Sequence, residues 1–107
     1  RSYSPTFLYR AIADGSADVI TAFSSDGRIA ALDLLTLADP RRALPSYDAV
    51  LLVAPRRAGE ARFLAALGPL IGAFPVERMR QANLMVDRDT DKRTPAEAAH
   101  WLDAGQR

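Results

Sequence analysis

The chain has 107 residues, of which 49% are hydrophobic and 25% are charged, a composition typical of one globular domain and not of a disordered segment. Its formal net charge of +1 and its isolated arginine pairs give no reason to expect a nucleic-acid interface. It has no cysteine, so neither a disulfide framework nor cysteine ligation of zinc is available.

The first part of the chain predicts a helix followed by a strand. Apolar residues recur on one helical face within residues 5–14, and Gly15 follows where a left-handed residue ends many helices. Residues 18–23 are mostly β-branched or apolar and lie between polar turn residues, a pattern that predicts a strand.

A short polar motif, Ser24-Ser25-Asp26-Gly27, ends that strand. Ser and Asp often begin helices, because their side-chain oxygens accept hydrogen bonds from the free backbone N–H groups of the first turn. The motif therefore predicts a short helix over residues 28–31, with Ser25 or Asp26 at its N-cap.

Two nearly continuous apolar runs come next, at residues 32–37 and 50–54. Such runs are typical of strands that are covered on both faces in an α/β sheet, so we expect both to be central strands. The loop between them contains Pro40 and Pro45 and ends near Tyr47, and it is long enough to carry functional residues.

The rest of the chain predicts helices. Gly68-Pro69 should break or kink the first of them, and Pro75 suits the first position of the next. Thr94 and Glu97 have the spacing of a capping box, in which each residue accepts a hydrogen bond from the backbone of the other. A last helix should therefore begin directly after Thr94.

Two aromatic residues, Phe23 and Tyr47, each lie inside a short motif. The motifs are Phe23-Ser24-Ser25-Asp26-Gly27-Arg28-Ile29 and Leu44-Pro45-Ser46-Tyr47-Asp48-Ala49-Val50. Their order and separation resemble those of the substrate-binding proteins of osmoprotectant ABC transporters, which take up glycine betaine, choline, carnitine and related solutes. These proteins usually carry a Tyr, then Thr-Asp-Gly-Arg-Ile, and later Pro-Pro-Tyr-Asp-Ala. This chain has Phe23 at the position of the first Tyr and Ser25 at that of the Thr.

The resemblance implies a ligand site. A quaternary ammonium group cannot donate a hydrogen bond, so proteins bind it with the faces of several aromatic rings. By resemblance, Tyr47 and Phe23 supply two rings of such a cage, and Ser24 and Ser25 at the helix start can face a ligand carboxylate. Asp26 belongs to the same turn, where we favour a structural role at the hinge. Without the resemblance, the two rings are packing residues and the two serines are helix caps.

The resemblance also implies a fold, over roughly residues 5–104. The chain is expected to be α/β, the later part of a bilobal, type II periplasmic-binding-protein-like fold with central strands flanked by helices. Residues 1–31 would end one lobe, residues 32–58 would form the hinge crossing and the central strands of the other lobe, and residues 59–107 would be the C-terminal helices of that lobe. The other cage aromatics would lie upstream, so this chain alone should bind ligand poorly.

The implied function is capture without chemistry. The protein, whether free, lipid-anchored or fused to its permease, would bind a quaternary ammonium solute at the periplasmic or extracellular face of the membrane and deliver it to the ABC permease without a cofactor. An effector-sensing or assembly domain of the same fold is the alternative. The chain begins with Arg1, so we expect a processed product or a fragment. A fragment would expose apolar surface, which predicts a homodimer or exchanged elements.

Two further signals do not make a site. Acidic residues alternate from Asp87 to Asp91 as in a calcium loop, but Lys92 and Ala98 stand where that loop requires Gly and Glu. His100 is the only histidine, and the serine motif lacks the Gly-x-Ser-x-Gly frame of a hydrolase. We therefore expect neither a metal nor an enzymatic activity.

Overall fold

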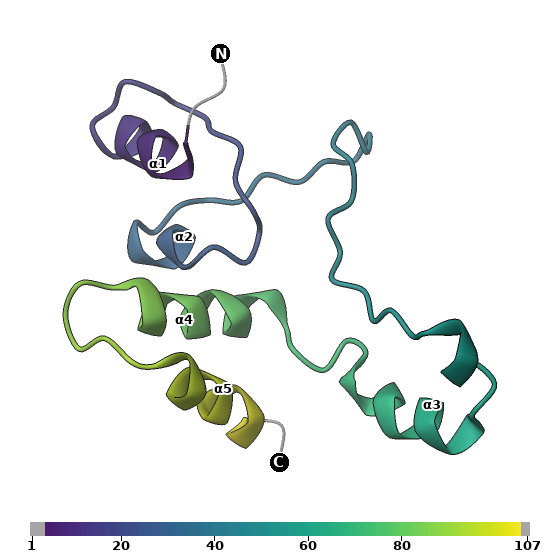
Figure 1. Ribbon diagram of the computed structural model, residues 1–107. Helices are drawn as coiled ribbons and strands as arrows, with labels where there is room; N and C mark the ends of the chain where they lie inside the picture. Colours follow the sequence, from purple (N-terminus) through teal and green to yellow (C-terminus); the bar gives the residue numbers. More distant parts are fainter. Residues whose placement is uncertain (1–3, 106–107) are drawn as a thin grey trace.

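The computed structural model describes residues 4–105, and within them the chain forms helices joined by turns and extended segments (Figure 1). The helices are α1 (Pro5–Ala13), α2 (Gly27–Ala31), the 3-10 helix η1 (Pro55–Arg57), α3 (Ala61–Leu67), the 3-10 helix η2 (Gly68–Leu70), α4 (Val76–Asp87) and α5 (Pro95–Ala104). None of these helices is both long and apolar enough to span a membrane.

Several helix ends follow the signals in the sequence. Gly15 adopts the left-handed conformation after α1, with a φ of 77°. The capping box of α5 is formed, because the Thr94 hydroxyl accepts from the Glu97 N–H at 3.3 Å and the Glu97 carboxylate accepts from the Thr94 N–H at 2.8 Å. The predicted break occurs at Gly68, where α3 gives way to η2. Pro75 is the N-cap of α4 and not its first helical residue, so that expectation is wrong by one position.

The helical core consists of α1, α2, α4 and α5, which lie one above another in Figure 1. The Arg28 guanidinium of α2 lies 4.5 Å from the centre of the Tyr9 ring of α1 and joins these two helices. α2 meets α4 at Gly27, where an added Cβ atom would lie 2.5 Å from the backbone nitrogen of Leu84. Only glycine permits such a close approach of two backbones.

The contact between α4 and α5 combines small residues with one arginine. Ala82 of α4 and Ala98 of α5 are both buried. The Arg78 guanidinium lies 4.3 Å from the centre of the Trp101 ring and donates a hydrogen bond to the Trp101 carbonyl at 2.9 Å. Arg78 therefore satisfies a free carbonyl near the end of α5 and covers the face of an aromatic ring at the same time.

The strands predicted at residues 18–23, 32–37 and 50–54 are not formed within the described part of the chain. Residues 32 and 33 form a turn with Asp33 at a φ of 49°, and none of the three segments builds a ladder with a neighbour among residues 4–105. The expectation that residues 32–37 and 50–54 are central strands covered on both faces is also wrong here, since Leu52 is 91% exposed and Leu35 is 85% exposed. An apolar run becomes a buried strand only where other strands and a covering layer meet it, and residues 4–105 do not supply them.

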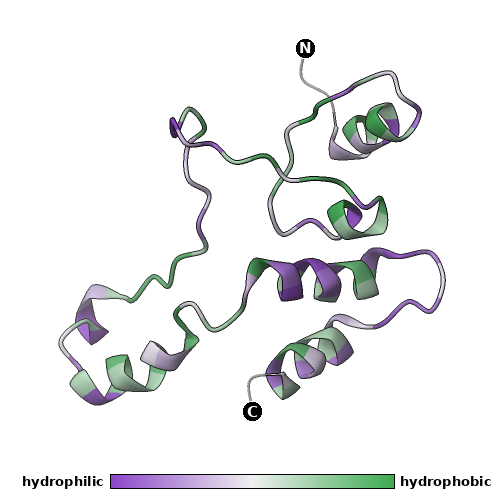
Figure 2. Ribbon diagram, turned by 180° about the vertical axis from the view of Figure 1, so that it is seen from behind, coloured by the Kyte–Doolittle hydropathy of each residue, from purple (hydrophilic) through white to green (hydrophobic). Residues whose placement is uncertain are grey.

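An arm, defined here as residues 38–74, leaves the helical core and carries α3 at its far end (Figure 1). Figure 2 shows hydrophobic residues in the stretch of the arm that leads to η1 and α3, away from the core. The radius of gyration is 17.2 Å, against about 13 Å expected for a compact domain of this length. The chain therefore has a small core and a long, largely uncovered arm.

Candidate ligand-binding site

The rings of Phe23 and Tyr47 lie against each other. Their centroids are 5.6 Å apart and their planes cross at 70°, which is the edge-to-face arrangement that aromatic pairs favour. Phe23 comes from the segment before α2 and is 59% exposed, whereas Tyr47 comes from the arm and is 79% exposed. This contact therefore joins the arm to the helical core and leaves ring faces accessible to solvent.

The two rings line an open cavity of about 500 Å³. Its walls include every residue predicted for the site, namely Phe23, Ser24, Ser25, Asp26 and Tyr47. Leu8 and Tyr9 of α1 and the arm residues Leu44 and Pro45 belong to the apolar part of the lining. A volume in this range is typical of sites for small molecules, although such sites are usually more enclosed.

Asp26 holds the turn that follows Phe23. Its carboxylate accepts a hydrogen bond from the Arg28 N–H at 3.0 Å and pairs with the Arg28 guanidinium at 3.3 Å. Its backbone N–H donates to the Phe23 carbonyl at 3.0 Å. Asp26 is thus the N-cap of α2.

The start of α2 has few free donors for an anion. The Arg28 N–H bonds the Asp26 carboxylate, and the Ile29 N–H bonds the Asp26 carbonyl at 3.2 Å. A ligand carboxylate at this end of the cavity would therefore depend mainly on the hydroxyls of Ser24 and Ser25.

Tyr9 is a site residue that the sequence analysis did not identify. It is 4% exposed and lines the cavity, and its hydroxyl is buried without a hydrogen-bond partner among the described residues. Burial, followed by the negative charge of Asp26, raises the pKa of Tyr9 to about 12. The sequence pattern that could have identified Tyr9 is an aromatic residue next to Leu8, on the predicted helix that precedes the Ser24-Ser25-Asp26-Gly27 motif.

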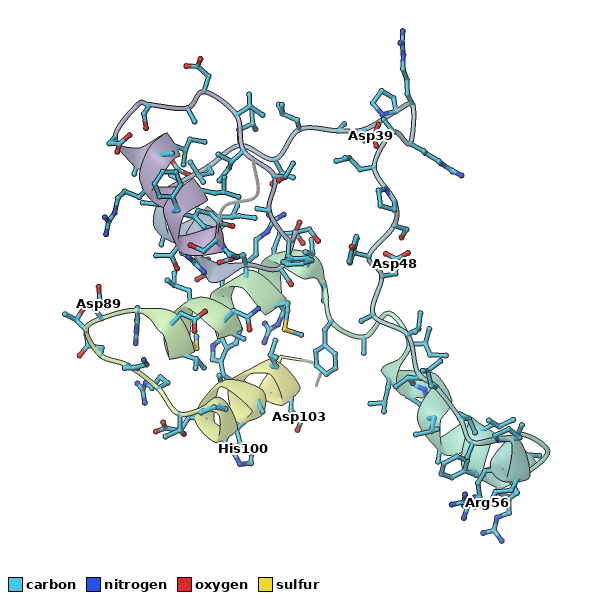
Figure 3. The ribbon with its side chains drawn as sticks, turned by 45° about the horizontal axis from the view of Figure 1, so that its top comes forward. Asp39, Asp48, Arg56, Asp89, His100 and Asp103 are labelled. Carbon is cyan, nitrogen blue, oxygen red and sulfur yellow. The ribbon has the colours of Figure 1, made fainter. Side chains whose placement is uncertain are left out.

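Local hydrogen bonds shape the loop that carries Tyr47. The Asp39 carboxylate accepts from the Leu44 N–H at 2.8 Å, and the Asp39 carbonyl accepts from the Arg42 N–H at 3.1 Å. Arg42 has a φ of 50°, so the loop reverses there in a left-handed conformation. The Leu44 N–H lowers the pKa of Asp39. Figure 3 shows Asp39 and Asp48 along this extended part of the arm.

Residues of α4 also reach the site from far along the chain. The Arg80 guanidinium donates to the Ser24 carbonyl, and the Asn83 side-chain amide donates to the Ser25 carbonyl. These two residues had no signal in the sequence beyond their place on a predicted helix.

The other candidate residues form no site in the described part of the chain. Residues 4–105 contain no group of three or more acidic or histidine side chains arranged to hold a metal ion, and this includes the acidic segment from Asp87 to Asp91. His100 lies on the face of α5 that is turned away from α4 (Figure 3).

Comparison with known proteins identifies the family. The family model for OpuAC, the substrate-binding domain of ABC-type glycine betaine transport systems, matches residues 3–104. No solved structure matches the chain significantly. The match spans nearly the whole chain, and membership implies a periplasmic-binding-protein fold and a substrate-binding role in an ABC transporter. This chain belongs to the family of substrate-binding domains of ABC-type glycine betaine transport systems.

Proposed function

We propose that this chain forms part of a site for a quaternary ammonium solute of the glycine betaine, choline or carnitine type, which the protein delivers to an ABC permease without chemical change. The observation that carries this proposal is the contact between the Phe23 and Tyr47 rings at the mouth of one cavity. Residues distant in the sequence meet there, and both belong to motifs that resemble those of osmoprotectant receptors.

The geometry of the ring pair suits a methylated ammonium group. Each accessible ring face contributes about 0.5–2 kcal/mol to the binding of a cation, and more where water is excluded. The planes of the two rings cross at 70°, so their accessible faces point in different directions and can contact two sides of one cation. Phe23 keeps the ring face but lacks the hydroxyl, so Tyr47 should be the stronger of the two contacts.

In this proposal, other parts of the full-length protein supply the remaining aromatic rings of the cage and the β-sheet. The extended segments at residues 32–37 and 50–54 would pair with strands from elsewhere in the full-length protein, which would complete an α/β lobe. A second lobe would then close over the open side of the cavity and exclude water. The location at the periplasmic or extracellular face of the membrane, with a lipid anchor or a permease fusion, belongs to the same proposal.

A second copy of the chain could cover the exposed apolar residues instead. In that case light scattering would report a dimer of the isolated chain, whereas a strictly monomeric and well-behaved species would contradict homodimerisation or exchange of elements.

Calorimetric titration of the full-length protein with glycine betaine, choline and carnitine tests the proposed function. At least one solute should bind, and Tyr47→Ala should weaken its binding by 1 kcal/mol or more, which is about fivefold in Kd. Tyr47→Phe, which keeps the ring, should retain most of the affinity. Phe74→Ala removes a partly exposed ring outside the cavity and serves as the matched control.

A second measurement, the ATPase activity of the permease with and without the solute, separates the transport receptor from the alternative. An effector-sensing or assembly domain without a transport role would leave the ATPase activity of the permease unchanged when the solute is added. Unchanged affinity in Tyr47→Ala would show that the ring pair is not part of the binding site.

A further inference from the structure

We infer that Arg80 and Asn83 of α4 are positioning residues for the ligand site, because they hold the Ser24-Ser25 turn by its two backbone carbonyls. This inference rests on the proposed function, since it concerns the same cavity. Both residues lie outside the cavity lining, so their effect on a ligand would pass through the turn.

The contacts span a long distance in the sequence. The Asn83 Nδ2 atom donates to the Ser25 carbonyl oxygen at 2.7 Å, and the Arg80 Nε atom donates to the Ser24 carbonyl oxygen at 2.5 Å. Hydrogen bonds from a charged guanidinium are roughly twice as strong as those between neutral groups. Together they fix the two successive peptide planes that contain the Ser24 and Ser25 carbonyls.

These bonds complete a turn that is otherwise held only from within. Asp26 bonds back to the Phe23 carbonyl and caps α2, but it sets only the local shape of the turn. The bonds from α4 add a fixed direction relative to the helical core. The backbone at Phe23, and with it the ring that meets Tyr47, is thereby placed against a packed helix.

Arg80 also reaches the chain on the other side of α2. Its second nitrogen donates to the Thr36 hydroxyl at 3.2 Å, in the segment that follows α2. A guanidinium has several N–H donors in one rigid plane and can therefore bridge two acceptors, which an ammonium group does less well. Arg80 thus connects the turn before α2 to the extended segment after it.

The register of α4 makes this arrangement possible. Arg80, Asn83 and Leu84 share one face of the helix, because they are three or four residues apart. Leu84 is the residue whose backbone meets Gly27, so the two donors lie beside the closest approach of α2 and α4. The neighbouring Gln81 is exposed.

The test is calorimetric titration of the full-length protein with glycine betaine, with choline and carnitine as further probes. Asn83→Asp keeps the shape of the side chain and removes its donor, and Arg80→Ala removes both donors. Each variant should weaken binding about tenfold. Arg80→Lys retains the charge but has a single donor nitrogen, so it should recover part of the affinity. Gln81→Ala is the matched control on the same helix and should bind like the wild type.

Hydrogen exchange without ligand provides the second readout. Loss of either donor should speed the exchange of the backbone amides from Ser25 to Arg28, while the melting temperature changes little. If Arg80→Ala does not fold, Thr36→Val removes one acceptor of the bridge and should weaken binding a few-fold.

The outcomes distinguish this inference from the function on which it rests. A wild-type protein that binds none of the three solutes overturns both. A wild type that binds, together with Asn83 and Arg80 variants whose Kd stays within about twofold of it, overturns the positioning role alone. A lower melting temperature with unchanged Kd would likewise assign these residues to stability and not to the site.

Discussion

The helical core and the arm are held in different ways. In the core, hydrogen bonds and ring contacts join residues that are far apart in the sequence, such as Arg80 with Ser24 and Arg78 with Trp101. In the arm, the hydrogen bonds described join residues within about one turn, as between Leu44 and Asp39. The comparison teaches that apolar content alone does not order a segment, because a strand or helix also needs a surface on which to pack.

The backbones of α2 and α4 cross closely at Gly27, and disruption of this crossing should have the largest effect. Gly27→Ala would place a Cβ atom 2.5 Å from the Leu84 backbone nitrogen and force the helices apart. We expect a loss of about 2–3 kcal/mol in the free energy of unfolding, measured by denaturant titration of the full-length protein. Gly59→Ala is the control, because an added Cβ there meets no atom within 4 Å. Equal stability of the two variants would contradict the close crossing.

In the arm, the corresponding experiment substitutes an exposed residue and asks whether it is buried in the full-length protein. Leu52 is almost fully exposed in this chain, yet it lies in a run with the pattern of a buried strand. If a sheet forms in the full-length protein, Leu52→Ser should lower its free energy of unfolding by about 2 kcal/mol, because an apolar side chain buried there is replaced by a small polar one. Protection of the amides at residues 50–54 from hydrogen exchange would locate the effect.

An unchanged free energy of unfolding in Leu52→Ser, with fast exchange at residues 50–54, would show that the arm stays uncovered in the complete protein. The contrast between core and arm would then be a property of the protein itself and not of the segment described.

The features that could be predicted from the sequence are those determined by neighbouring residues. The cap at Asp26, the left-handed Gly15 and the capping box of α5 depend on a few adjacent side chains, and all three are present. The strands depend on partners that no local pattern specifies, so they were predicted but did not form. Tyr9 and Asn83 act through the packing of helices against each other, which the hydrophobic pattern does not resolve.

Removing the capping box tests whether a local hydrogen-bond motif contributes as much to the free energy of unfolding as the packing between helices. Thr94→Ala removes the hydroxyl that accepts from the Glu97 N–H and should cost about 1 kcal/mol in the free energy of unfolding, less than the change at Gly27. Thr90→Ala, in the exposed turn before α5, is the control. A loss equal to that of Gly27→Ala would show that the cap supports more of the core than α5.

The same cap should respond to acid. Hydrogen bonds from Thr94 lower the pKa of Glu97, so this contribution to stability is present above the ordinary carboxyl pKa of 4.5 and is lost as pH falls through the lowered value. Comparing Glu97→Gln with the wild type between pH 5 and pH 3 checks the sign, because the variant should lack this part of the acid dependence.

Substitution of Tyr9 should have the smallest effect on the free energy of unfolding at neutral pH and a clear effect at alkaline pH. Its buried hydroxyl has no hydrogen-bond partner among residues 4–105, so Tyr9→Phe removes a desolvated polar group and keeps the ring beneath Arg28. We expect a gain of about 0.5 kcal/mol in the free energy of unfolding at pH 7. A loss of 1 kcal/mol or more would instead indicate that the hydroxyl has a partner in the full-length protein.

The alkaline behaviour of Tyr9 follows from its pKa, which rises from 10.0 in the unfolded chain to about 12 in the fold. Between these values the unfolded chain loses the proton while the folded chain retains it, so the free energy of unfolding falls as pH rises. Tyr9→Phe should remove this part of the alkaline decline, and the absorbance change of tyrosine ionisation near pH 12 should disappear with it. An unchanged decline would mean that neither burial nor the charge of Asp26 acts on this hydroxyl. Tyr9 would then be more accessible to water than its exposed fraction of 4% indicates.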